Sequence, residues 1–183
     1  MATIQSLLTA EEYATLPDLE GHHELVRGEI VYMNLPSFRH GKVCAKIARL
    51  VGYHVDMNDM GHLLSNDSGV ITQRGPDTVR GADVAFYSYD AVPKGERPRL
   101  YASKPPELVF EVKSRDDRWP KIHEKIAEYL AVGVRIVCVA DPNTETLAIH
   151  HAERPVQSLS GGDELTLPDV LGDFRVPISK FFE

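Results

Sequence analysis

Short apolar, β-prone runs alternate with segments of helical periodicity along this chain, and this order restricts the fold more than any other property of the sequence. Val134–Ala140 is apolar and rich in β-branched residues, as in a strand covered on both faces. Apolar residues recur with helical spacing between His40 and Val55, and Pro120 and Gly133 suit the two ends of a further helix. The order predicts an α/β or α+β fold, a mixed sheet flanked by helices.

The remaining elements follow from local patterns. Thr9 and Glu12 form a capping-box pattern that predicts a short leading helix ended by Pro17. The predicted strands are a hairpin or bent pair over His23–Met33, then Gly69–Gln73, Ala82–Tyr87, Glu107–Ser114, Val134–Ala140 and Thr146–His151. The predicted longer helices are His40–Val55 and Trp119–Ala131. The tail Gly161–Glu183 is expected to be a surface loop closed by an apolar end.

Length and composition favour a single domain over residues 1–183. A chain of 183 residues with 43% hydrophobic residues can bury one ordinary core. No apolar run approaches the roughly 20 residues that span a bilayer, and acidic Glu11 and Glu12 do not fit a leader peptide, so we expect a cytoplasmic protein without membrane contact. Cys44 and Cys138 lack metal-site spacing and are interpreted as small buried hydrophobic residues.

The acidic balance counts against a protein that wraps nucleic acid. A net charge of -7 leaves few basic groups to neutralise phosphates. Two local basic runs soften this objection, although each could equally be a solvated face. The runs are Arg39, His40, Lys42, Lys46 and Arg49, and Lys94, Arg97, Arg99 and Lys104.

Three charged residues interrupt apolar strands and are the candidates for chemistry. Alternation places Glu111 and Lys113 on one face of the strand Glu107–Ser114, a pairing that, taken alone, favours a structural ion pair. Asp83 begins another apolar strand, where carboxylates are rare without a partner. Together, the two carboxylates could bind Mg²⁺ while the lysine orients water or stabilises the charge that develops on phosphate.

The motifs around these residues are similar to a known pattern. Gly81-Ala82-Asp83 followed by Glu111-Val112-Lys113 resembles the PD-(D/E)xK nuclease signature. The segments HELVRGEIVYM, RGADVAF, PPELVFEVKS and GDELTLPDVLGDFRV resemble the Uma2 (Uma-two) family of restriction endonuclease-like proteins along nearly the whole chain. Many relatives have leucine where this chain has Lys113, and proline where it has Ala82, so the lysine position is intact here.

The resemblance implies a restriction endonuclease-like core and a role for each site residue. Asp83 and Glu111 would bind Mg²⁺, with Mn²⁺ as a possible substitute, and Lys113 would be the catalytic lysine. Glu24 would be a further acidic member, and Lys125 would assist from its helix. The resemblance also implies a homodimer.

Each secondary candidate has a structural alternative. Glu24 could simply pair with Arg27, and Lys125 could lie over the core residue Tyr129 four positions later. His40 could contact a phosphate or a water, or could be a capping or core group. His22 and His23 would point to opposite faces of a strand and so make no shared metal site.

The leading hypothesis is a Mg²⁺-dependent endonuclease that hydrolyses phosphodiester bonds in DNA. One alternative is a non-catalytic nucleic-acid-binding or scaffold protein that keeps the nuclease fold, which the acidic net charge favours. Another is a metal-dependent enzyme that acts on a smaller substrate such as a nucleotide.

Overall fold

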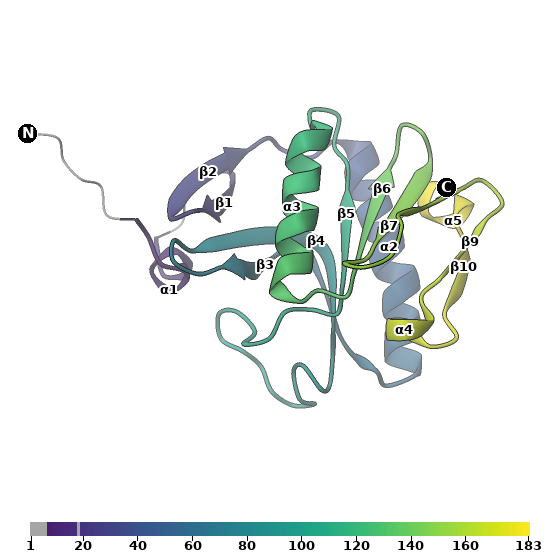
Figure 1. Ribbon diagram of the computed structural model, residues 1–183, viewed down its shortest axis with the longest axis horizontal. Helices are drawn as coiled ribbons and strands as arrows, with labels where there is room; N and C mark the ends of the chain where they lie inside the picture. Colours follow the sequence, from purple (N-terminus) through teal and green to yellow (C-terminus); the bar gives the residue numbers. More distant parts are fainter. Residues whose placement is uncertain (1–6, 18) are drawn as a thin grey trace, which may run out of the picture.

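A computed structural model describes residues 7–17 and 19–183 of the protein (Figure 1). Within that part of the chain the main sheet has eight strands, in the order β2-β1-β4-β5-β6-β7-β8 with β3 paired to β4, and β9 and β10 form a separate hairpin. The strands are β1 (His22–Val26), β2 (Glu29–Met33), β3 (Gly61–Gln73), β4 (Thr78–Ser88), β5 (Leu108–Val112), β6 (Ile136–Asp141), β7 (Thr146–His150), β8 (Gln157–Ser160), β9 (Glu164–Thr166) and β10 (Arg175–Pro177). The helices are α1 (Ala10–Ala14), α2 (Phe38–Met57), α3 (Trp119–Val132), α4 (Pro168–Leu171) and α5 (Ser179–Phe182).

The main sheet is mixed, as predicted. β5 and β6 are parallel and are joined through α3, while the other neighbouring pairs in the sheet are antiparallel. β4 is the organising strand because it pairs with β3 on one side and with two strands on the other. It meets β1 at Val79 and β5 from Val84 to Phe86, so β1 and β5 separate alongside residues 80–83. We call this point the strand fork.

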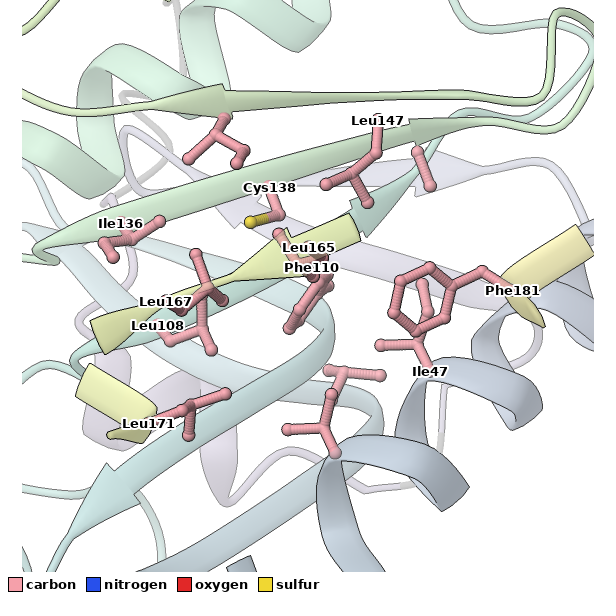
Figure 2. Packing of buried hydrophobic residues seen from close by; sticks show 14 of the residues in the cluster. Ile47, Leu108, Phe110, Ile136, Cys138, Leu147, Leu165, Leu167, Leu171 and Phe181 are labelled. Carbon is pink, nitrogen blue, oxygen red and sulfur yellow. The ribbon is translucent and has the colours of Figure 1, made fainter. Parts of the chain in front are cut away.

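Helices cover both faces of the sheet, which explains why the central strands are apolar throughout. In Figure 1, α3 lies across the near face and α2 lies behind the sheet. The α3 face buries Val109, Val137 and Tyr129. The α2 face buries Phe110 and Ile47, with residues of the C-terminal segment packed on them (Figure 2).

Local capping signals set the helix ends. Thr9 and Glu12 form the predicted capping box of α1. Pro120 lies in the first turn of α3, and Gly133 ends that helix with a φ of 108°, a left-handed conformation that glycine adopts without strain. α2 begins at Phe38 rather than His40, because the Ser37 side chain accepts a hydrogen bond from the His40 backbone N–H.

Two predicted strands are longer than expected. The strand predicted at Gly69–Gln73 begins at Gly61, and the one predicted at Ala82–Tyr87 begins at Thr78. Both extensions carry polar residues, which obscure the apolar pattern of a strand. Hydrogen bonding between the two strands nevertheless keeps them paired along nearly their whole length.

The expectation of a surface loop over Gly161–Glu183 is wrong. This segment forms the β9–β10 hairpin and two short helices. Its apolar residues are buried against α2 and the sheet, namely Leu165, Leu167, Leu171, Phe174, Ile178 and Phe181. They are spaced among prolines, glycines and charges, so no strand or helix period is visible in the sequence.

No helix in the described residues is both long enough and apolar enough to cross a membrane.

Candidate active site

A polar pocket of about 100 Å³ lies at the strand fork. It is lined by His22, His23, Glu24, Met33, Asn34, Pro36, His40, Asp67, Gly81, Asp83, Glu111, Val112, Ser114, Asp117 and Lys125. The structure therefore brings together five of the six residues that the sequence singles out. These are Asp83, Glu111, Glu24, His40 and Lys125.

Asp83 is anchored to the neighbouring strand. Its Oδ2 accepts a 2.6 Å hydrogen bond from the Val112 backbone N–H, and its Oδ1 lies 3.3 Å from His40 Nε2. The side chain is only 9% exposed. A carboxylate has about four acceptor positions, so these contacts leave Asp83 able to accept further ligands.

A bulge in β3 lies opposite Asp83. The pairing with β4 shifts between Ser65 and Ser68, and the intervening Asn66 and Asp67 have positive φ angles of 68° and 53°. Gly81 makes room for this bulge, because a Cβ there would lie 3.0 Å from Asp67 Cβ. The bulge brings Asp67 to the pocket, where burial and the charge of Asp83 raise its pKa.

Asp67 is not among the candidates chosen from the sequence, although the residues around it indicate an irregularity in the strand. Asn-Asp-Ser-Gly at residues 66–69 is a turn-like sequence inside a strand, and Asn and Asp are the non-glycine residues that most readily adopt left-handed conformations. Such a sequence between apolar strand segments indicates a bulge.

Glu111 projects from β5 toward α3. Its Oε1 accepts a 2.8 Å hydrogen bond from the Tyr129 hydroxyl, and its Oε2 lies 3.5 Å from Lys125 Nζ. Burial raises the pKa of Glu111, the charge of Lys125 opposes this effect and the charge of Asp83 adds to it, so that the pKa lies at about 7. A cation bound near Asp83 and Glu111 would relieve this penalty.

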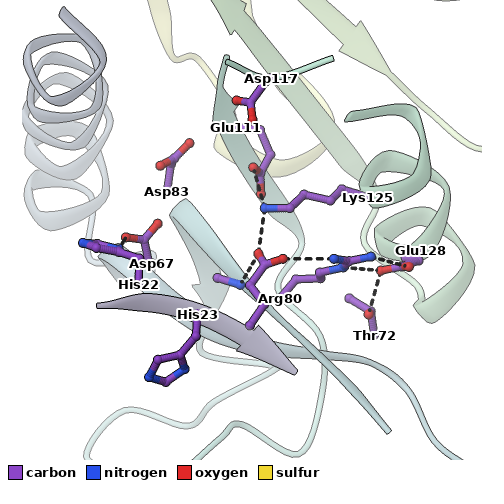
Figure 3. Close-up of polar contacts among 12 residues, drawn as sticks. His22, His23, Asp67, Thr72, Arg80, Asp83, Glu111, Asp117, Lys125 and Glu128 are labelled. Atoms are coloured by element: carbon purple, nitrogen blue, oxygen red, sulfur yellow. Dashed lines mark hydrogen bonds and ion pairs between the residues drawn. The ribbon is translucent and has the colours of Figure 1, made fainter. Parts of the chain in front are cut away.

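Glu24 belongs to a buried ion network rather than to a pair with Arg27. Its Oε1 lies 2.7 Å from Lys125 Nζ, and Arg80 donates a 2.9 Å hydrogen bond to its Oε2. Arg80 also binds Glu128 through two nitrogens, at 2.7 and 2.8 Å. Figure 3 shows Lys125 extending from α3 toward Glu111, with Arg80 and Glu128 alongside.

Neighbouring opposite charges keep the acidic and basic groups of this network ionised despite their burial. Burial alone would raise the pKa of Glu24, but Lys125 and Arg80 outweigh it, so the pKa of Glu24 is lowered. For Lys125, burial opposes the charged form, yet Glu111 and Glu24 raise its pKa. Glu24 and Lys125 are therefore both charged near neutral pH.

His40 is the third residue of α2 and faces the pocket. Burial opposes its charged form, but contact with Asp83 and the charges of Asp67 and Asp117 raise its pKa. Cys44, one turn further along α2, lies 3.4 Å from His40 Nδ1. Burial and the nearby Asp83 raise the pKa of the Cys44 thiol far above its usual range.

Lys113 lies outside the pocket that the other five candidates line. It follows the last residue of β5, its Nζ lies 3.6 Å from Asp141 Oδ2, and it sits 5.8 Å from the centre of the Trp119 ring. The pocket lining does not include it. The ammonium next to Glu111 belongs to Lys125 instead, so the ion pair between Glu111 and Lys113 that spacing favours is not formed.

The donor set fits a hard divalent cation. Among the described residues, five carboxylates line the pocket, those of Glu24, Asp67, Asp83, Glu111 and Asp117, and Lys125 is the one lysine or arginine of the lining. Carboxylates therefore outnumber the permanent cations of the lining, and a bound divalent cation would offset part of their charge. Carboxylate oxygens with room for water are the ligands that Mg²⁺ prefers.

The comparisons agree with this fold. No curated protein matches the chain. Among solved structures, "a putative nuclease belonging to DUF820" from Anabaena variabilis is similar, with a TM-score of 0.81 and 16% sequence identity over 96% of this chain and 97% of that one. At this identity the likeness establishes the fold, a mixed sheet flanked by helices. A family model described as "Uma2: Putative restriction endonuclease" matches residues 10–179, and the chain therefore belongs to the Uma2 family.

Proposed function

We propose that the protein is an endonuclease that hydrolyses phosphodiester bonds in DNA with the help of Mg²⁺, or of Mn²⁺ in its place. The observation that carries this proposal is the convergence of Asp83, Glu111 and Lys125 on one pocket in a chain of the Uma2 family. They come from two adjacent strands and from the helix packed over them.

Asp83 and Glu111 would hold the metal ion. A bound Mg²⁺ would polarise the phosphate and lower the pKa of a water molecule in its coordination shell. The hydrogen bonds from the Val112 N–H and the Tyr129 hydroxyl fix the two carboxylates before any ligand arrives. Such prior positioning is worth more than the same contacts formed during the reaction.

Lys125 is the residue we propose for charge stabilisation at the phosphate. Its ammonium lies at the pocket wall, between Glu24 and Glu111, and is held charged by both. In hydrolysis, water adds to phosphorus, the bond to the leaving oxygen breaks, and negative charge grows on the phosphate oxygens. Lys125 could donate to one of these oxygens, and Lys113 would need to leave Asp141 to do so.

The surroundings of the pocket suit a nucleic acid chain. Pro36 and His40 bring the N-terminal end of the 20-residue helix α2 to the pocket, where its dipole favours an anion. Tyr32, Leu35 and Phe38 are 62%, 78% and 89% exposed and lie within two residues of lining residues in the chain. Exposed aromatic rings of this kind can stack on bases.

The size of the pocket favours a polymer over a free nucleotide. A cavity of about 100 Å³ is smaller than the roughly 300–1,000 Å³ of sites that enclose small molecules. A single phosphate of a longer chain could enter it while the neighbouring nucleotides lie across the surface.

A cleavage assay on supercoiled plasmid, linear duplex and single-stranded DNA tests the proposal. Wild type should nick or cut in Mg²⁺ or Mn²⁺ and not in EDTA, and Glu111→Ala should be inactive. Equal behaviour of the two proteins would reject catalysis at this site. Tight duplex binding without turnover would support a scaffold, and strong competition by mononucleotides would indicate a smaller substrate.

By family resemblance we also propose a homodimer, which light scattering after size-exclusion chromatography would test through its mass.

A further inference from the structure

A nitrogen, a sulfur and an oxygen meet at the edge of the candidate active site. The ligand atoms of His40, Cys44 and Asp83 all lie within 4.8 Å of one another. His40 Nε2 is 3.3 Å from Asp83 Oδ1, and Cys44 Sγ is 3.4 Å from His40 Nδ1 and 4.0 Å from His40 Nε2. The Mg²⁺ ligands assigned above do not account for the thiol in this group.

The fold holds these three side chains in place. His40 and Cys44 are four residues apart on α2, so they share one face of the helix. Asp83 reaches them from β4, opposite the bulge, and is fixed by its bond from the Val112 N–H. The side chains of His40 and Asp83 are 12% and 9% exposed, so the group is mostly shielded from solvent.

The spacing matches a tetrahedral metal site. Zinc bonds of roughly 2.0–2.3 Å to nitrogen, oxygen and sulfur require ligand atoms about 3.3–3.8 Å apart. The contact between His40 Nε2 and Asp83 Oδ1 already has this length. Cys44 Sγ lies 4.0 Å from His40 Nε2 and within 4.8 Å of the Asp83 ligand atom, so the cysteine side chain would move toward a bound ion. Three protein ligands would leave one position open, and His40 and Asp83 both line the pocket.

We propose that His40, Cys44 and Asp83 form a second metal-binding set that takes a thiophilic divalent ion such as Zn²⁺. Because Asp83 belongs to both sets, binding of this ion would change the affinity for Mg²⁺, by competition or through a shared carboxylate. A thiolate and an imidazole favour zinc, whereas Mg²⁺ requires oxygen ligands in octahedral geometry. On binding, the Cys44 thiol would lose its proton to solvent and the sulfur would bond to the metal.

The same three residues resemble a nucleophilic Cys–His–Asp arrangement, but access argues against that use. The pocket lining includes His40 and Asp83 and not Cys44. A sulfur behind the wall cannot reach a substrate carbonyl or phosphorus, while a metal ion held between the three side chains needs no such access.

Cobalt provides a test that does not depend on nuclease activity. Co²⁺ titrated into wild type should give a near-ultraviolet absorption band from thiolate bonded to cobalt. Cys44→Ser should lose the band, whereas Cys138→Ser, which alters the other cysteine in the buried core, should keep it. A wild type without the band, or a Cys44→Ser variant that retains it, would overturn the proposal.

A second variant keeps the test valid if Cys44→Ser unfolds, which circular dichroism would reveal. Asp83→Asn preserves both thiols and should weaken Co²⁺ binding by about 10–100-fold, the loss that even changes next to metal ligands cause. Unchanged Co²⁺ affinity in that variant would exclude Asp83 from the set.

The effect of Zn²⁺ on the proposed Mg²⁺ site is measured with Mn²⁺, whose free ion has an electron paramagnetic resonance signal. Zn²⁺ should change the affinity of wild type for Mn²⁺, and an Mn²⁺ affinity that Zn²⁺ leaves unchanged would contradict a shared Asp83. The Mn²⁺ experiment depends on the proposed Mg²⁺ site, whereas the cobalt absorption band does not depend on it. A protein that gives the band yet binds no Mn²⁺ and leaves plasmid intact would refute the proposed function and retain the thiolate site.

Discussion

Asp83, Glu111 and Glu24 are held by different sets of partners, with Lys125 shared by Glu111 and Glu24, and these partners distinguish the roles of the residues. A backbone N–H holds Asp83, a tyrosine and a lysine hold Glu111, and two cations hold Glu24. Glu111 and Asp67 line the pocket with raised pKa values, whereas the pKa of Glu24 is lowered because Lys125 and Arg80 outweigh the effect of burial. Glu24 is best described as the residue that positions Lys125.

The first prediction concerns the two lysines. Lys125→Met should reduce plasmid nicking by about 10²–10³-fold, the cost of removing one group that stabilises transition-state charge. Lys113→Met should lower activity by less than tenfold, because its ammonium faces Asp141. Initial rates at saturating Mg²⁺ compare them, and a larger loss in Lys113→Met would restore the assignment that the family resemblance implies.

A second prediction follows from the raised pKa of Glu111. In the folded protein the Glu111 carboxyl group keeps its proton up to about pH 7. In the unfolded chain the same group loses its proton near its ordinary pKa of 4.5. Ionising Glu111 therefore costs folding stability that grows between these two values and stays constant above the higher one. In EDTA, Glu111→Gln should raise the free energy of unfolding at pH 8 by about 1–3 kcal/mol, and the gain should vanish below pH 4.5.

Urea denaturation across this range measures the effect, with the exposed Glu29→Gln as a control for removing one negative charge. A pH-independent difference between wild type and Glu111→Gln would show that Glu111 ionises in the folded state as it does in the unfolded chain.

Sequence alone could identify some site residues and not others. Asp83 and Glu111 are visible because a carboxylate inside an apolar strand violates the strand pattern. Asp67 and Cys44 are not visible in this way, because a bulge and a helix face bring them to the site. The choice between Lys113 and Lys125 depends on where each ammonium ends, which strand alternation cannot decide.

At the scale of elements, the strand fork explains why the site is polar. β1 and β5 separate alongside residues 80–83, and carboxylates occupy the gap by accepting hydrogen bonds from the Gly81 and Val112 backbone N–H groups. An unpaired buried N–H is costly, so Glu24 and Asp83 complete the sheet as well as the site.

The helices and central strands were predictable because capping residues and apolar runs are local signals. The C-terminal segment was not, because its burial depends on α2 and the sheet, which lie far away in the sequence. Its apolar residues fill the α2 face without forming a periodic element of their own.

A third prediction tests this segment. Phe181 is fully buried in the core of the α2 face, so Phe181→Ala should lower the free energy of unfolding by about 3–5 kcal/mol. The neighbouring Phe182, only partly buried, serves as the control and should cost less when changed to alanine. Chemical denaturation measures both, and equal small losses would mean that the segment contributes little to the core.

At the scale of the whole molecule, an acidic protein that acts on DNA, as we propose, would bind this anionic polymer through a local surface. The net charge of -7 is partly the charge of the site itself, which a metal ion would offset. The N-terminal end of α2 and the exposed aromatic residues beside it form the surface that could bind DNA despite the negative net charge.

The fourth prediction addresses that surface. Phe38→Ala should weaken binding of single-stranded DNA by about 1–3 kcal/mol, the value of one stacked base, while stability changes by less than about 0.5 kcal/mol because Phe38 is 89% exposed. Tyr53→Ala, an exposed aromatic near the other end of α2, is the control. Fluorescence anisotropy in EDTA would compare the two variants, and equal affinities would exclude stacking at Phe38.

The central claim is that Asp83 and Glu111 form a metal site for phosphodiester hydrolysis, and calorimetric titration of Mg²⁺ and Mn²⁺ into wild type and Asp83→Ala tests it most directly. We predict that wild type binds both ions and nicks supercoiled plasmid in a parallel assay, and that Asp83→Ala loses binding and nicking together. Wild type that binds neither ion and leaves the plasmid intact would contradict the account and favour a scaffold protein that keeps the nuclease fold.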